Sequence, residues 1–94
     1  MGIQRPIEDQ STNLLWLGYA GLSLHYTTIR AVLIYQPQLN QRIHADYGSV
    51  PSGIHTVVVT DQGCYLPSRW RPEQIRSRWA RWRASLSPEP PNER

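Results

Sequence analysis

Two successive patterns fill residues 54–86, which read IHTVVVTDQGCYLPSRWRPEQIRSRWARWRASL. The first half is a run of β-branched residues at 54–60, followed by the turn signal DQG at 61–63 and a short apolar segment. β-Branched residues favour strands, and a glycine-containing turn of this length favours an antiparallel hairpin. We therefore expect one strand at 54–60 and a second at 64–66, which Pro67 ends.

The second half of this stretch has the spacing of an amphipathic helix. Apolar side chains recur at intervals of four, three and four residues, at Ile75, Trp79, Trp82 and Leu86. These intervals place all four on one face of an α-helix. Pro72 suits the first helical turn, where its missing N–H costs nothing. The spacing predicts a helix from Pro72 to Leu86 whose apolar stripe packs as core.

Short strands are also predicted upstream of residue 54. Apolar side chains alternate on both sides of Gly21, at 15–19 and at 22–26, which predicts a hairpin. A helix over 12–24 is the alternative, and two glycines at 18 and 21 weaken it because glycine destabilises helices.

Two further segments complete the expected sheet. Residues 29–35, IRAVLIY, form an apolar run typical of a buried strand. Residues 41–47 alternate apolar and polar side chains, which predicts another strand with His44 and Asp46 on one face. The expected fold class is a β-rich α+β domain: a small curled antiparallel sheet or barrel of five to six short strands, followed by one C-terminal amphipathic helix.

The length of 94 residues allows one domain at most. Residues 1–10 are predicted to form an extended arm, residues 87–94 a proline-rich polar tail, and residues 11–86 a single β-plus-helix domain. A lone cysteine, Cys64, excludes a disulfide scaffold and suits a reducing compartment. The uncharged stretch at 10–29 carries too many polar residues for a membrane span, so we expect a cytoplasmic protein.

Positive charge is concentrated in one segment of the chain. The sequence has ten arginines, no lysine and seven acidic residues, for a net charge of +3. Six of the arginines lie between residues 69 and 83, where Glu73 is the only acidic residue. They are Arg69, Arg71, Arg76, Arg78, Arg81 and Arg83. Such asymmetry is typical of an electrostatic contact site, although the arginines would also suit a helix that merely needs solvated side chains.

Three interpretations of this basic segment stay open. In the first, the arginines bind nucleic acid, since the guanidinium group donates two parallel hydrogen bonds to phosphate. In the second, they form salt bridges or cation–π contacts within the fold or with a partner protein, as Arg69, Trp70 and Arg71 could do. In the third, the helix lies on an anionic membrane surface.

The first of these interpretations gives the expected function. We expect a small, non-catalytic, basic protein that contacts nucleic acid through its Arg/Trp-rich C-terminal helix, with Trp70 and the six arginines as contact residues. The alternative is an accessory or regulatory subunit that binds an acidic surface of a larger protein assembly. Because so short a chain buries only about 60–65% of the surface that it exposes when unfolded, partners or homo-oligomerisation would stabilise it.

Candidate catalytic and metal-binding residues are sparse. The sequence has no C-x-x-C, H-E-x-x-H, P-loop or G-x-G-x-x-G motif. His25, His44 and His55 fall on three predicted strands and would form an acid–base or metal site only if they converge. We therefore expect a binding protein rather than an enzyme, with no metal and no cofactor. Tyrosines on the predicted strands would offer faces on which single-stranded bases stack.

Overall fold

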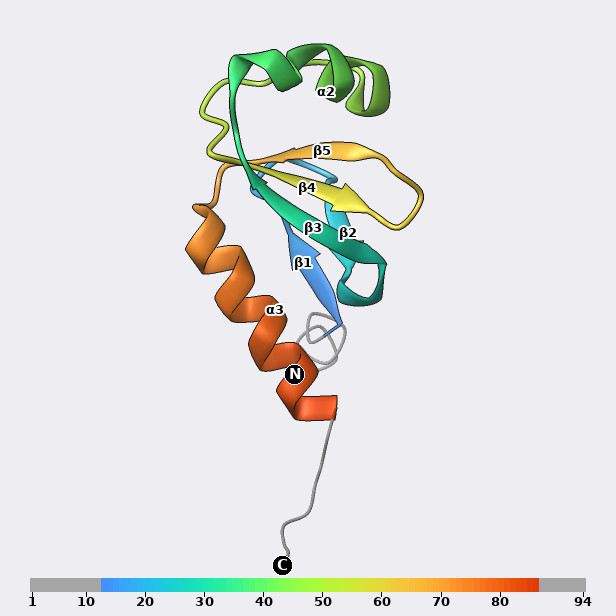
Figure 1. Cartoon of the computed structure of the whole chain (residues 1–94), viewed down its shortest axis with the longest axis vertical. Helices are drawn as coiled ribbons and strands as arrows, with labels where there is room; N and C mark the ends of the chain where they lie inside the picture. The colour runs from blue at the N-terminus through green and yellow to red at the C-terminus, as the bar shows by residue number, and fades with distance from the viewer. Residues whose placement is uncertain (1–12, 87–94) are drawn as a thin grey trace, which may run out of the picture.

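Two small antiparallel sheets and a C-terminal helix make up the computed structural model, which describes residues 13–86 (Figure 1). The strands are β1 (Leu14–Trp16), β2 (Ser23–His25), β3 (Ile29–Ile34), β4 (Thr56–Thr60) and β5 (Tyr65–Ser68). The helices are α2 (Asn40–Tyr47) and α3 (Pro72–Leu86), with short 3-10 turns η1 (Tyr26–Thr28) and η2 (Pro37–Leu39). The predicted arm at 1–10 and the predicted tail at 87–94 lie outside the described residues.

The α+β class and the C-terminal helix are confirmed, but the expected sheet is not. Within residues 13–86, β1 pairs with β2 alone, while β3, β4 and β5 form a second sheet in that order. The prediction of one curled sheet or barrel of five to six strands was therefore wrong. The turn η1 interrupts the chain between β2 and β3, so the hairpin does not extend the larger sheet.

The hairpin predicted around Gly21 is confirmed, which excludes the alternative helix over 12–24. Leu15 of β1 pairs with Leu24 of β2, and beyond the strands the Leu17 N–H donates to the Leu22 carbonyl at 3.0 Å. Gly21 lies in this reversal with a φ of 75°, a value that side-chain-bearing residues rarely adopt.

The three-stranded sheet contains the strands predicted at 29–35, 54–60 and 64–66, with ends that differ from the prediction by one or two residues. Pro67 does not end β5 but lies inside it, opposite Val57. Because β5 is paired on one side only, proline's missing N–H is tolerated there, as it is on edge strands generally.

The segment at 41–47 was predicted as a strand and is instead most of helix α2. A proline, Pro37, starts the turn η2 that leads into this helix, and Gly48 ends it with a φ of 103° and an N–H bonded to the His44 carbonyl. Proline before a helix and glycine after it are ordinary boundary signals. In this segment these boundary signals outweigh the alternation of apolar and polar residues that predicted a strand. Ile43 is the buried residue of the helix. Residues 44 and 46 therefore share no strand face.

Helix α3 lies along the strands and completes the core (Figure 1). Its Ile75 is fully buried, and Trp79 and Trp82 are half-buried against the core. The prediction that the whole apolar stripe packs as core is wrong at its last residue, because Leu86 is 58% exposed. Figure 1 shows the reason: the last turn of α3 extends past the strands on which the earlier turns pack.

A tight contact holds the β1–β2 reversal against the segment that precedes α3. Gly18 has a φ of 99°, and a Cβ at this position would overlap Cγ of Arg69. We expect Gly18→Ala to lower the free energy of unfolding by about 2–4 kcal/mol, since it adds overpacking to the strain of a positive φ. Urea denaturation measures the loss.

Gly21→Ala is the matched control for this prediction. Gly21 shares the positive φ, at 75°, but a Cβ there would meet nothing within 4 Å. We expect its loss to stay near the roughly 1–2 kcal/mol of backbone strain alone. Equal losses in the two variants would show that Arg69 moves aside at no cost.

Candidate nucleic-acid interface

Buried hydrogen bonds set the position of Trp70, which lies in the connection 69–71 between β5 and α3. The hydroxyl of fully buried Ser68 donates to the Leu17 carbonyl at 2.9 Å and accepts from the Trp70 N–H at 3.1 Å. The hydroxyl of fully buried Thr56 donates to the Trp70 carbonyl at 2.6 Å. Since buried polar groups are costly to leave unpaired, these bonds give this connection, and the start of α3, a defined place.

The side chain of Gln74 caps the first turn of α3. The Arg71 N–H donates to the side-chain oxygen of Gln74 at 2.9 Å, and the Arg71 carbonyl accepts from the N–H groups of Gln74 and Ile75. The bond from the Arg71 N–H to Gln74 is one half of a capping box, with glutamine in the third helical position. The carboxylate of Glu73 in the same turn suits the positive end of the helix dipole.

All six arginines of the basic segment are exposed, but three of them also bind within the fold. The guanidinium of Arg69 lies 5.2 Å from the ring centre of Tyr19, and that of Arg83 lies 4.5 Å from the ring centre of Trp79. Nη2 of Arg76 donates to the Val32 carbonyl at 3.2 Å. These contacts are of the kind that the second interpretation expected.

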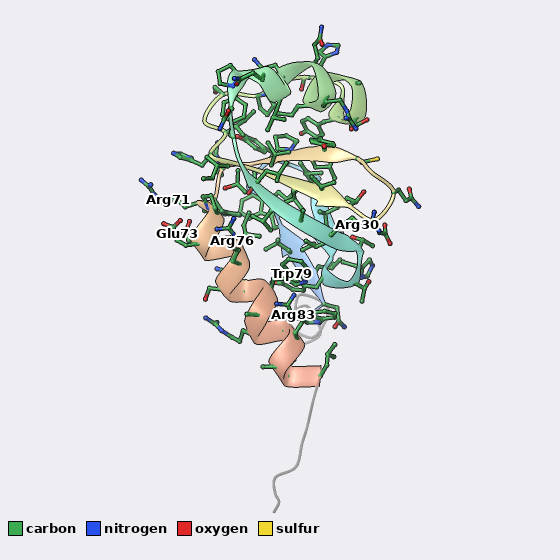
Figure 2. All side chains as sticks on the ribbon, in the orientation of Figure 1. Arg30, Arg71, Glu73, Arg76, Trp79 and Arg83 are labelled. Carbon is green, nitrogen blue, oxygen red and sulfur yellow. The ribbon has the colours of Figure 1, made fainter. Side chains whose placement is uncertain are left out.

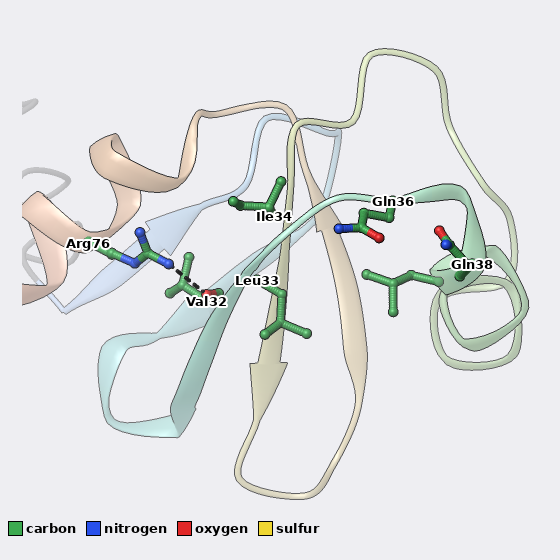
Figure 3. A pocket seen from close by; sticks show the side chains of 7 residues that line it. Val32, Leu33, Ile34, Gln36, Gln38 and Arg76 are labelled. Carbon is green, nitrogen blue, oxygen red and sulfur yellow. Dashed lines mark hydrogen bonds between the residues drawn. The ribbon is translucent and has the colours of Figure 1, made fainter.

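The contacts of Arg69 and Arg76 have local consequences. Burial raises the pKa of Tyr19, and the hydrogen bond and charge of Arg69 offset part of that rise. Arg76 borders a cleft of about 440 Å³ beside β3, where its bond to Val32 turns the guanidinium toward the strand (Figure 3). Arg76, Trp79 and Arg83 lie on the side of α3 that faces the strands (Figure 2).

The other three arginines form what we call the arginine face: Arg71, Arg78 and Arg81. Their guanidinium groups have no hydrogen bond or ion pair with any residue between 13 and 86. Arg78 and Arg81 line a polar groove of about 360 Å³ with Glu73, Gln74 and Ser77. Figure 2 shows Arg71 at the start of α3, pointing away from the strands.

A second feature, which the sequence did not predict, lies next to the arginine face. We call it the aromatic pocket, a cavity of about 220 Å³. It is lined by Leu14, Leu15, Trp16, Tyr26, Trp70 and Arg78. The rings of Trp16 and Trp70 meet edge to face with centres 5.7 Å apart, and Tyr26 stacks on Trp82 with centres 5.4 Å apart.

Trp16 is the functional candidate that the sequence analysis missed. Its side chain is 51% exposed, and it lies beside Trp70 because the Trp70 indole N–H donates to the Trp16 carbonyl at 2.7 Å. These residues are 54 positions apart, so no local pattern could have joined them. One signal was available in the sequence. Trp16 directly follows Leu15 in a predicted strand, so the large apolar ring of Trp16 lies on the face opposite to the buried Leu15.

The tyrosines do not form the strand-borne stacking surface that was expected. Tyr65 is in β5, but Tyr26 is in η1 and Tyr47 is in α2, while Tyr19 and Tyr35 lie outside the strands. Tyr19 and Tyr26 are also buried, so their ring faces serve the core.

The three histidines lie in or beside three different elements and do not form the acid–base or metal site that was considered above. His25 ends β2, His44 lies in α2, and His55 precedes β4 with its Nδ1 at 3.0 Å from the Arg69 carbonyl. In the part of the chain that the structure describes, no group of three or more His, Cys, Asp or Glu side chains is placed to hold a metal ion. None of the helices within residues 13–86 has the length and apolar character to cross a membrane.

Comparison with known proteins found no match. No protein-family model, no curated protein and no solved structure matches this chain. Its function is therefore inferred from the geometry of α3 and of the strands and turns beside it.

Proposed function

We propose that this chain is a non-catalytic nucleic-acid-binding protein that contacts its ligand through the arginine face of α3. The observation that carries the proposal is that Arg71, Arg78 and Arg81 are exposed and that their guanidinium groups have no ion-pair partner between residues 13 and 86. Because a helix rises about 1.5 Å per residue, these guanidinium groups are distributed over about 15 Å of its length. Phosphates along one strand offer charges at comparable intervals, and each accepts two parallel bonds from one guanidinium.

The neighbouring charges favour the same class of ligand. Arg69, Arg76 and Arg83 are held within the fold but remain exposed, so they add to the positive potential around α3. Glu73 is the acidic residue in the polar groove, and it lies in the first turn, where the helix dipole accounts for it.

The alternative is an accessory subunit that binds an acidic protein surface, and one observation favours it. Trp16 is 51% exposed, and exposed tryptophans beside arginines are frequent anchors of protein interfaces. The two candidates differ in salt dependence, because phosphate contacts release condensed counterions whereas a tryptophan anchor does not.

Fluorescence anisotropy with labelled oligonucleotides tests the proposal. If three phosphates of a single strand are neutralised, the affinity should fall about 20-fold between roughly 50 and 200 mM salt. A polyglutamate peptide of the same length and label is the control for an acidic protein surface, and it should bind at least tenfold more weakly. Absence of oligonucleotide binding at the lower salt concentration, or equal binding of polyglutamate, would overturn the proposal.

A further inference from the structure

We infer that the ligand is single-stranded, and that the aromatic pocket receives one of its unpaired bases. This inference rests on the proposed function, and it adds the class of nucleic acid and the position of a base. The pocket is lined by two leucines, three aromatic residues and Arg78, and the surface that it exposes is part polar and part apolar. A flat aromatic ligand that carries an adjacent negative charge fits this combination, and a nucleotide within a strand has both properties.

Neither tryptophan of the pocket has a free indole N–H to offer a ligand. The indole N–H of Trp16 donates to the Tyr19 carbonyl at 2.8 Å, and that of Trp70 donates to the Trp16 carbonyl at 2.7 Å. Both polar atoms are therefore already used within the fold. What remains for a ligand is stacking and edge contact, which every base can make and which gives little sequence preference.

The pocket is also held in shape before any ligand binds. Trp16 pairs with Ser23 in the β1–β2 hairpin, and the buried bonds of Ser68 and Thr56 hold the backbone of Trp70. The stack of Tyr26 on Trp82 connects the pocket to α3. A cavity of about 220 Å³ equals the liquid volume of roughly seven waters, which suits one planar ring system.

Arg78 connects the pocket to the arginine face. Its side chain borders both the aromatic pocket and the polar groove that contains Arg81. A base next to Trp16 would therefore place its own phosphate near Arg78 and the next phosphates along α3. In a duplex the bases are paired and stacked inside the helix, so a duplex could use the arginine face but not the pocket.

An abasic oligonucleotide provides the first test, with the unmodified protein. Such a strand keeps every phosphate and lacks every base, so its affinity should be about 5- to 150-fold lower than that of the matched strand with bases, as expected for one lost stacking contact. Equal affinity for the two strands would overturn the inference. It would leave the proposed function intact, because the phosphates alone would then account for binding.

Substitution of Trp16 provides the second test. Trp16→Leu keeps the apolar bulk of a strand residue but removes the ring, so it should reduce affinity for the strand with bases by a similar 5- to 150-fold and leave the abasic strand unaffected. Trp16→Phe keeps a ring face and should retain most of the affinity. Ile34→Ala is the control at another exposed apolar residue, 62% exposed on β3, and should change neither affinity.

The outcomes separate the two proposals. Weaker binding of both strands by Trp16→Leu, with an unchanged circular dichroism spectrum, would show that Trp16 positions the arginine face rather than a base, and would overturn the inference. Failure of both strands to bind the unmodified protein would overturn the proposed function and the inference together.

Discussion

Replacement of Ile75 by alanine should lower the free energy of unfolding by about 2–5 kcal/mol. Ile75 is completely buried, and it belongs to the core cluster that includes Leu15, Leu17 and Val58. It is also the residue of α3 with the greatest burial, so its removal leaves a cavity where the helix meets the strands. A domain of this size is stable by roughly 4–11 kcal/mol, so the loss is a large part of the total.

Thermal and urea denaturation measure this effect. Because a loss of 1 kcal/mol lowers the Tm of a small domain by about 4–8 °C, a decrease of roughly 10 °C or more is expected. Leu86→Ala is the matched control, since Leu86 lies on the same predicted stripe of the same helix but is 58% exposed. It should change the stability by less than about 0.5 kcal/mol. Similar losses in the two variants would contradict the packing of α3 described above.

The second large effect concerns binding. Replacement of Arg71, Arg78 and Arg81 together by glutamine should weaken single-strand binding about 10²- to 10³-fold at roughly 50 mM salt. The physical reason is the loss of three phosphate contacts and of the counterions that they release. The fold should persist, because the three guanidinium groups have no partner between residues 13 and 86. Anisotropy titration and circular dichroism measure the two properties on the same samples.

A second triple variant controls for net charge. Replacement of Arg69, Arg76 and Arg83 by glutamine removes the same charge from the same segment, but these side chains contact Tyr19, Val32 and Trp79. This variant should lose less affinity, roughly tenfold, and more stability, about 1–2 kcal/mol. An equal loss of affinity in the two triple variants would mean that binding follows total charge and that the arginine face has no special role.

Several elements could be predicted from the sequence because their signals are local. The helix Pro72–Leu86 combines a sustained apolar spacing with a proline in its first turn, and β4 combines β-branched residues with a glycine turn. The segment at 41–47 was misassigned because seven residues fit both the strand and the helix period. Its real boundaries were marked outside the segment, by Pro37 and Gly48.

Some features of the candidate site could likewise be predicted from the sequence, and others depended on the packing of the elements. Concentration of arginine in residues 69–83 is a property of the chain alone, and so is the amphipathic character of the helix that carries most of them. Periodicity does not show which arginines contact other elements. Arg76 donates to the backbone of β3, whereas Arg78 borders a pocket that residues of β1 also line.

The aromatic pocket is the clearest example of a feature that only the tertiary structure reveals. Trp16 and Trp70 are separated by 54 positions, and they meet because hydrogen bonds join the two segments: from the Ser68 hydroxyl to the Leu17 carbonyl and from the Trp70 indole N–H to the Trp16 carbonyl. Helical and strand periods describe neighbours within one element, whereas contacts between elements depend on how sheets and helices pack around a shared core. The sequence thus contained the basic helix, and packing determined which of its charges face outward and which rings lie beside them.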